Sequence, residues 1–172
     1  MIGYMSIAEQ VDVDFTRAVR RSFVHRVGAR LRGGPSYSRA PSFEEAARAL
    51  DARNKLRLGR RVVAVEKVVG SVGRFRDFDG EFLPIRRSVG ERWKRVDRAF
   101  HLGVDLPPVV LYKIGDSYYV LDGNHRVSVA RFQGVLWIEA EVTRLYVGKT
   151  ATSSCLAAVN QKTESTPQPA AA

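Results

Sequence analysis

Cysteine, histidine and long apolar runs are all scarce in this sequence. Its 172 residues include one cysteine, Cys155, and three histidines. A single thiol excludes an internal disulfide framework and a cysteine-rich zinc site. The apolar runs are too short for a transmembrane helix, and residues 1–14 lack the basic start and apolar run of a secretory signal. We therefore expect a cytoplasmic protein with one domain and extensions, and no membrane span.

Acidic residues are also few relative to basic ones. The chain has 28 Lys and Arg against 18 Asp and Glu, a net charge of +10. A positive field of this size favours polyanionic partners, which include nucleic acids, nucleotides and anionic membrane surfaces. Composition alone does not choose among these partners, and a merely soluble basic protein fits the same numbers equally well.

The basic residues concentrate near the N-terminus. Six arginines and no acid lie between residues 15 and 32, and apolar side chains recur at every fourth position from Phe15 to Leu31. This pattern predicts an amphipathic helix capped by Asp14. Such a helix docks on a core, grips a phosphate backbone or lies on a membrane, and docking is the commonest of the three. The DNA contacts that we expect come from Arg17, Arg20, Arg21 and Arg30.

Two capping-box patterns predict further helices. Ser42 with Glu45 begins one helix, and Ser88 with Glu91 begins another that ends at Gly103. The helical and basic character of the first part continues to about residue 60, and residues 148–172 are rich in Thr, Ser, Gln, Pro and Ala. We expect a basic helical extension over 1–60, a domain over 61–147 and a disordered tail over 148–172.

The domain itself combines strands and helices. Residues 62–65 predict a strand, and residues 109–114 and 118–121 flank a Gly-Asp-Ser turn in the pattern of a hairpin. A helix over 125–133 and a strand over 136–145 follow, the strand with alternating apolar and polar residues. These elements predict an α+β fold.

The segment from Asp122 to Arg126 has the composition of an anion site. A strand that turns through glycine into a helix directs unpaired backbone N–H groups at one point, where the helix dipole adds positive charge. Asn124 is the expected cap, and His125 and Arg126 add donors that suit a phosphate. The alternative is an ordinary turn with two solvated side chains. His125 has no neighbouring nucleophile and no spaced partner for a metal, so no metal site is predicted.

The stretch Tyr-Tyr-Val-Leu-Asp-Gly-Asn-His-Arg-Val-Ser-Val-Ala at 118–130, with Gly134 and an Ile-Glu-Ala strand after it, resembles the ParB/sulfiredoxin superfamily. Upstream, residues 65–68 with Gly73 and Arg74 resemble the opening strand and arginine loop of a ParB N-terminal-like domain. The resemblance covers about residues 61–146, and it implies a small mixed sheet with packed helices. It implies a phosphate or nucleotide site at Gly73, Arg74, Asp122, Gly123, Asn124, His125 and Arg126.

The activities of this superfamily transfer only in part. ParB proteins hydrolyse CTP, so the resemblance implies a nucleotide (CTP, ATP or ADP) with Mg²⁺. Sulfiredoxin chemistry needs a cysteine before the His-Arg pair, where this chain has Asn124. The free-serine kinases use a glutamate on the first loop, and residues 70–73 offer no carboxylate. The helix-turn-helix and dimerisation domains of ParB have no counterpart after residue 147, so operator binding of that kind is not predicted.

Three functions remain, and the first is preferred. In the first, the chain is a nucleotide-binding module whose basic helices contact DNA. In the second, it is a phosphate-ester enzyme, which would be a nuclease, a nucleotidase or a kinase. In the third, it is a scaffold for protein contacts. The enzyme hypothesis gives His125 the role of acid or base, with Asp77 or Asp79 holding Mg²⁺. The sequence leaves open whether the chain forms a homodimer.

Overall fold

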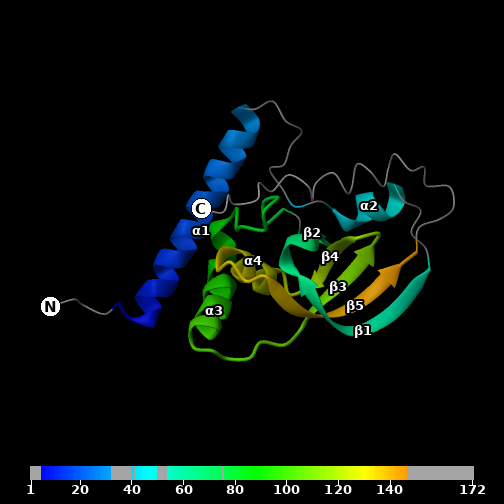
Figure 1. Ribbon diagram of the computed structural model, residues 1–172. Coiled ribbons are helices and arrows are strands. Elements are labelled where there is room, and N and C mark those ends of the chain that lie inside the picture. The colour runs from blue at the N-terminus through cyan, green and yellow to red at the C-terminus, as the bar shows by residue number, and fades with distance from the viewer. Residues whose placement is uncertain (1–4, 32–39, 41, 50–53, 75, 147–172) are drawn as a thin grey trace, which may run out of the picture.

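The computed structural model describes residues 5–31, 40, 42–49, 54–74 and 76–146. These residues form a five-stranded mixed sheet with helices packed on both faces, so the α+β prediction is confirmed (Figure 1). The strands are β1 (Lys55–Ala64), β2 (Val68–Ser71), β3 (Val109–Ile114), β4 (Ser117–Asp122) and β5 (Trp137–Leu145). The α-helices are α1 (Ile7–Leu31), α2 (Phe43–Ala49), α3 (Gly90–His101) and α4 (Asn124–Phe132).

The strand order in the sheet is β1-β5-β3-β4-β2. β3 and β4 form the antiparallel hairpin that the sequence predicts, and β5 lies parallel to β3 after the α4 crossover. β1 pairs with β5 in antiparallel register from Lys55 opposite Leu145 to Ala64 opposite Trp137. β2 lies parallel to β4 at the other edge. The end of β4 and the start of α4 therefore meet beside the middle strand of the sheet.

Alternate residues of β3 face opposite sides of the sheet, as in any strand. Leu111 belongs to the main core with Val127 of α4 and with Phe78 from the loop before α3. Ile114 faces the other side, where Phe43 of α2 packs with it in a second core cluster. Both faces of the sheet are therefore covered, each by a different helix.

α1 packs against α3 in a third cluster. Phe15 lies with its ring centroid 5.6 Å from that of Trp93, and Ala18 is fully buried in the same cluster. The Trp93 indole N–H donates a 3.0 Å hydrogen bond to Ser128 Oγ of α4. The first half of α1 is therefore an integral layer of the fold, which agrees with the docking hypothesis for this helix.

α1 begins earlier than the sequence pattern predicts. Ser6 and Glu9 form the capping box, because Ser6 N–H donates to the Glu9 carboxylate at 2.8 Å and Glu9 N–H donates to Ser6 Oγ at 3.3 Å. The prediction of Asp14 as the cap is wrong, since it lies buried inside the helix. The predicted apolar side of this helix, from Phe15 to Leu31, is also wrong at its C-terminal end, where Leu31 is 83% exposed. Residues spaced by four turn through about 400°, so Phe15 and Leu31 face directions roughly 160° apart.

Two other elements differ from the sequence prediction. β1 begins at Lys55, inside the stretch predicted as a helical extension, because its pairing with β5 provides partners along its whole length. The pattern at Ser88 and Glu91 does not form a capping box, since residues 87–89 make a 3-10 turn and Val89 precedes α3 without a side-chain cap. The predicted tail over 148–172 lies outside the described residues. None of the helices described is long and apolar enough to cross a membrane.

Candidate anion-binding site

The corner between β4 and α4 depends on Gly123. Its φ of +98° lies in the left-handed region, which is unfavourable for residues other than glycine. A Cβ at this position would lie 2.6 Å from Val109 Cγ1 and 3.1 Å from Arg126 Cζ. The sheet and the arginine therefore close around the glycine, and the chain passes from strand to helix without an intervening loop.

The N-terminus of α4 has no side-chain cap. Gly123 is the N-cap residue, and the first N–H that bonds back to it is that of Val127, at 3.0 Å from the Gly123 oxygen. The predicted cap Asn124 is instead the first helical residue, so that prediction is wrong. Asn124 is only 6% exposed, and its Oδ1 accepts no hydrogen bond from the described residues. The N–H groups of the first turn keep the partial positive charge of an uncapped helix.

Four arginines line a cleft of about 310 Å³ in front of this helix start, and Asp122 is the only acid among its lining residues. Arg74 comes from the loop after β2, as the resemblance implies. Arg92 and Arg95 come from α3, one helical turn apart, and the sequence analysis did not identify them. The fourth arginine is Arg126 of α4. The cleft therefore combines an excess of positive charge with an uncapped helix N-terminus, which suits an anion.

Arg126 has a structural part in this corner. Its Nη1 donates to the backbone oxygens of Pro107 and Pro108, the latter at 2.9 Å, and its Nη2 donates to Asp122 at 2.7 Å. These bonds tie the start of α4 to the segment before β3. Arg126 contributes charge to the cleft, while most of its hydrogen-bonding capacity is used within the chain.

His125 lies half-buried beside the cleft, with its ring 5.5 Å from that of Phe78 in an edge-on contact. Burial lowers the pKa of His125 to about 4, and the positive charges of Arg74 and Arg92 act in the same direction. Neither ring nitrogen has a hydrogen-bond partner among the described residues. The imidazole is therefore neutral at pH 7 and a weak base, and both of its ring nitrogens are buried.

The acidic loop predicted to hold Mg²⁺ does not line the cleft. Asp77 forms an ion pair with Arg74 at 3.3 Å. Asp79 is buried, accepts the backbone N–H groups of Glu81 and Leu83 through Oδ1, and has its pKa raised by burial. These hydrogen bonds indicate that Asp79 stabilises a tight loop. Gly73 precedes Arg74 in the loop and does not line the cleft either.

A larger groove of about 910 Å³ adjoins the cleft and shares Val96 and Arg126 with it. It runs between the end of α3, the segment before β3 and the start of β5. Phe100 and Trp137 line it with a large part of each side chain exposed. The groove therefore offers flat apolar surface next to the positively charged cleft.

Comparison with known proteins adds little to this geometry. No protein-family model and no curated protein matches the chain. Among solved structures, the chain is similar to sulfiredoxin from Arabidopsis thaliana, with 16% identity and a TM-score of 0.37 over 58% of this chain and 94% of that one. At that identity and TM-score the similarity carries no inference about the site, and the fold described above rests on the strands and helices of this chain.

Proposed function

We propose that this protein binds a phosphate-bearing ligand, most specifically a nucleotide, at the N-terminus of α4. The observation that carries the proposal is the cleft lined by four arginines in front of a helix start that has no side-chain cap. Phosphate oxygens would accept the free N–H groups of the first turn and pair with the guanidinium groups.

The adjoining groove favours a nucleotide over a simple phosphate ion. The two hollows meet at Val96 and Arg126, so a ligand with phosphates in the cleft reaches the exposed rings of Phe100 and Trp137. Aromatic side chains stack on the flat face of any base, and stacking contributes about 1–3 kcal/mol per base. Nothing in this lining selects one base, so the choice among CTP, ATP, ADP and GTP is made by experiment.

A thermal-shift panel of those four nucleotides and pyrophosphate, each with and without Mg²⁺, tests the proposal. A ligand at a hundredfold its Kd stabilises the folded state by about 2.7 kcal/mol, or roughly 5–10 °C for a domain of this size. The variant to compare is Arg92→Gln with Arg95→Gln, because both arginines are exposed and neither holds the fold together as Arg126 does. Arg98→Gln is the matched control, an exposed arginine on the same helix that does not line the cleft.

A shift for one nucleotide that the double variant loses and the control keeps would support the cleft as its site. An equal shift in all three proteins, or no shift with any ligand, would contradict the proposal. Release of inorganic phosphate in the same samples would favour the phosphate-ester enzyme. The low pKa of His125 and the buried position of Asp79 argue against those two residues as its catalytic groups.

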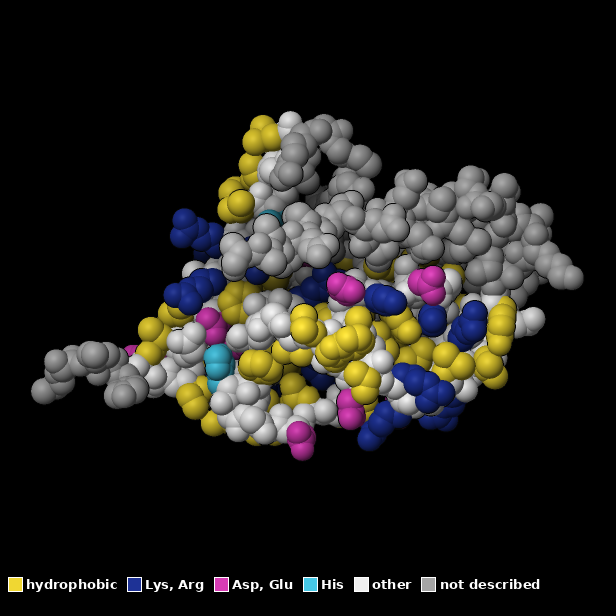
Figure 2. All heavy atoms as spheres, in the orientation of Figure 1, with side chains coloured by type: hydrophobic (Ala, Val, Ile, Leu, Met, Phe, Trp, Pro, Cys, Tyr) yellow, Lys and Arg dark blue, Asp and Glu magenta, His cyan; other side chains and the backbone are white. Residues whose placement is uncertain are grey.

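We propose DNA as a second, separate ligand because α1 presents exposed arginines on its outer side. Figure 2 shows Lys and Arg side chains along this helix and along the β1 edge of the sheet. Arg17, Arg20 and Arg21 are all exposed, whereas the side chain of Arg30 lies outside the described residues. Their proximity favours contact with a phosphate backbone.

Titration of a short duplex at several salt concentrations tests this second ligand. The logarithm of the affinity should fall linearly with that of the salt concentration, by about 0.9 for each phosphate neutralised. Replacing Arg17, Arg20 and Arg21 by glutamine should flatten that slope by up to about 3. The control is Arg98→Gln, and an unchanged slope in the triple variant would reject DNA binding by α1.

A further inference from the structure

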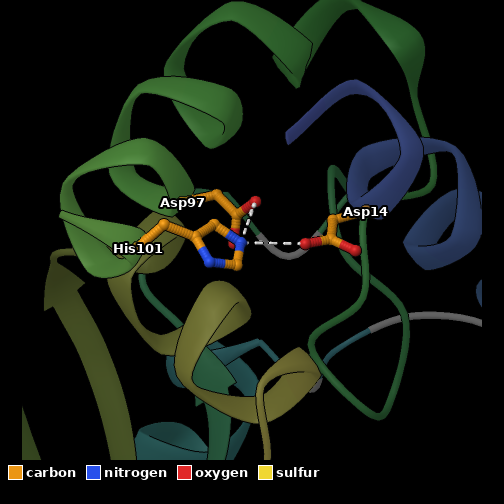
Figure 3. A group of neighbouring side chains, drawn as sticks. All are labelled: Asp14, Asp97 and His101. Carbon is orange, nitrogen blue, oxygen red and sulfur yellow. Dashed lines mark hydrogen bonds and ion pairs between the residues drawn. The ribbon is translucent and has the colours of Figure 1, made fainter. Parts of the chain in front are cut away.

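Three ionisable side chains meet between α1 and α3, away from the lining of the cleft. Asp14 comes from the first half of α1, and Asp97 and His101 lie one turn apart on α3 (Figure 3). His101 Nε2 is 2.9 Å from Asp14 Oδ2 and 3.6 Å from Asp97 Oδ2. All three atoms lie within 4.8 Å of one another, so they surround a common point.

Each carboxylate is oriented by an amide. Gln10 Nε2 donates to Asp14 Oδ1 at 3.0 Å, and Gln133 Nε2 donates to Asp97 Oδ1 at 2.8 Å. The second oxygen of each carboxylate faces His101. Hydrogen bonds from outer residues to the non-ligating oxygen are the usual support of metal-binding carboxylates. The cluster thus has the two shells that a metal site requires.

The charge of this cluster is not balanced by the residues around it. Asp97 has no exposed surface, and its Oδ2 accepts no hydrogen bond from the described residues. Two carboxylates leave an excess negative charge even with a protonated imidazole. The guanidinium of Arg17 lies 3.9 Å from Asp14 Oδ1, but the Arg17 side chain is 67% exposed, so solvent weakens its effect. An uncompensated buried carboxylate is strongly unfavourable, and a divalent cation would remove the excess.

We propose that Asp14 Oδ2, Asp97 Oδ2 and His101 Nε2 bind a divalent transition-metal ion, for which Zn²⁺ is the best fit. Ligand atoms about 2.0–2.1 Å from a tetrahedral zinc ion lie about 3.3–3.5 Å apart, and the two distances from His101 Nε2 bracket that value. The imidazole nitrogen favours Zn²⁺ over Mg²⁺ and Ca²⁺, which prefer oxygen ligands alone. The His101 side chain is 25% exposed, which leaves a path for the ion and room for a water as fourth ligand.

The site would connect the N-terminal helix to the domain. Asp14 is the only ligand from α1, while the other two belong to α3. A bound ion would therefore add a link between the two helices beside the packing of Phe15 on Trp93. Its occupancy would govern how firmly α1, with its exposed arginines, is held against the domain.

Metal titrations of the full chain test the site. All proteins carry Cys155→Ser, so that no thiol competes, and binding is followed by calorimetry with Zn²⁺ and by visible absorption with Co²⁺ as a spectroscopic substitute. The site predicts one ion per chain, with affinity lowered at least roughly tenfold in His101→Gln and in Asp97→Asn. Gln133→Leu, which removes the amide that orients Asp97, should lower the affinity roughly 10–100-fold. The matched control His25→Gln, which replaces a histidine of α1 outside the cluster, should bind as the parent does.

A second measurement does not depend on the folding of the variants. In the Cys155→Ser parent, the imidazole nitrogens of each histidine give separate ¹⁵N NMR signals, and coordination should move the Nε2 signal of His101 on addition of one equivalent of Zn²⁺. Saturable movement of that signal, with circular dichroism unchanged, is the expected result. No movement at His101, or Zn²⁺ binding that His101→Gln and Asp97→Asn leave intact in folded protein, would overturn the proposal. The cluster would then be a metal-free ion pair.

Discussion

Replacing His125 by phenylalanine should change how the stability of this protein depends on pH. Burial, together with the charges of Arg74 and Arg92, lowers the pKa of His125 from 6.5 to about 4. Between those values the unfolded chain binds a proton that the folded chain does not, so the free energy of unfolding falls as the pH falls through this window. The contribution of neutral His125 to the free energy of unfolding is fully retained above pH 6.5. With about 1.36 kcal/mol for each pKa unit, His125 accounts for a loss of about 2 kcal/mol between pH 7 and pH 5.

Urea unfolding at pH 7 and pH 5 measures this loss in three proteins: the wild type, His125→Phe and His125→Gln. Phenylalanine keeps an aromatic ring against Phe78 and glutamine does not, so the two variants should differ in stability at pH 7. Neither variant titrates at this position, and both should lose about 2 kcal/mol less than the wild type on acidification. An equal loss in all three proteins would mean that the fold does not resist protonation of His125, and the inferred positive potential of the cleft would be refuted.

Two further predictions concern residues that shape the site. Gly123→Ala should destabilise the protein by about 3 kcal/mol, since the methyl group meets a β3 valine at 2.6 Å and the backbone is left-handed; Gly134→Ala, also left-handed but in open space, should lose about 1 kcal/mol. A similar loss in both urea titrations would mean that the corner relaxes freely. Arg131→Met should lose about 3 kcal/mol, because the arginine donates to Glu81 and to three backbone oxygens, two in the 3-10 turn before β2 and one at the start of β2. In the same assay, exposed Arg98→Met should change stability by less than about 0.5 kcal/mol, and equal effects would contradict the structural role of Arg131.

The parts of the fold that the sequence predicts well are those fixed by local chemistry. The alternation in β5 predicts its buried side because a strand has a period of two and Ala140 and Val142 both face the main core. The Gly-Asp-Ser turn predicts the β3–β4 hairpin, since glycine at position 115 adopts a left-handed φ of 58°. The corner at Gly123 is predictable for the same reason, because the residue types of a strand-to-helix turn are restricted by backbone geometry.

The parts that the sequence does not predict depend on contacts between distant segments. Arg92 and Arg95 line the cleft because α3 packs against α4, and no local sequence pattern shows this contact. Aspartate is a common residue type at helix caps, and only the packing of α1 on α3 shows that Asp14 faces His101. The spacing of Asp97 and His101, four residues apart on one helix, was the available sequence signal for the proposed metal site, and it becomes significant only when Asp14 of α1 is placed beside them.

The start of α4 in the candidate anion site differs from the start of α1. α1 begins with a complete capping box, whereas α4 begins at a glycine that offers no side-chain acceptor. Asp77 and Asp122 pair with two of the four arginines of the cleft, which leaves an excess of positive charge, and the imidazole of His125 is kept neutral by burial and by the charges of Arg74 and Arg92. An excess of like charge lowers the stability of the free protein, and a bound anion would reverse that effect. A merely structural corner needs the left-handed glycine, but it does not need the two exposed arginines that α3 places in the cleft, Arg92 and Arg95. The arrangement is therefore better explained by a ligand than by the needs of the fold.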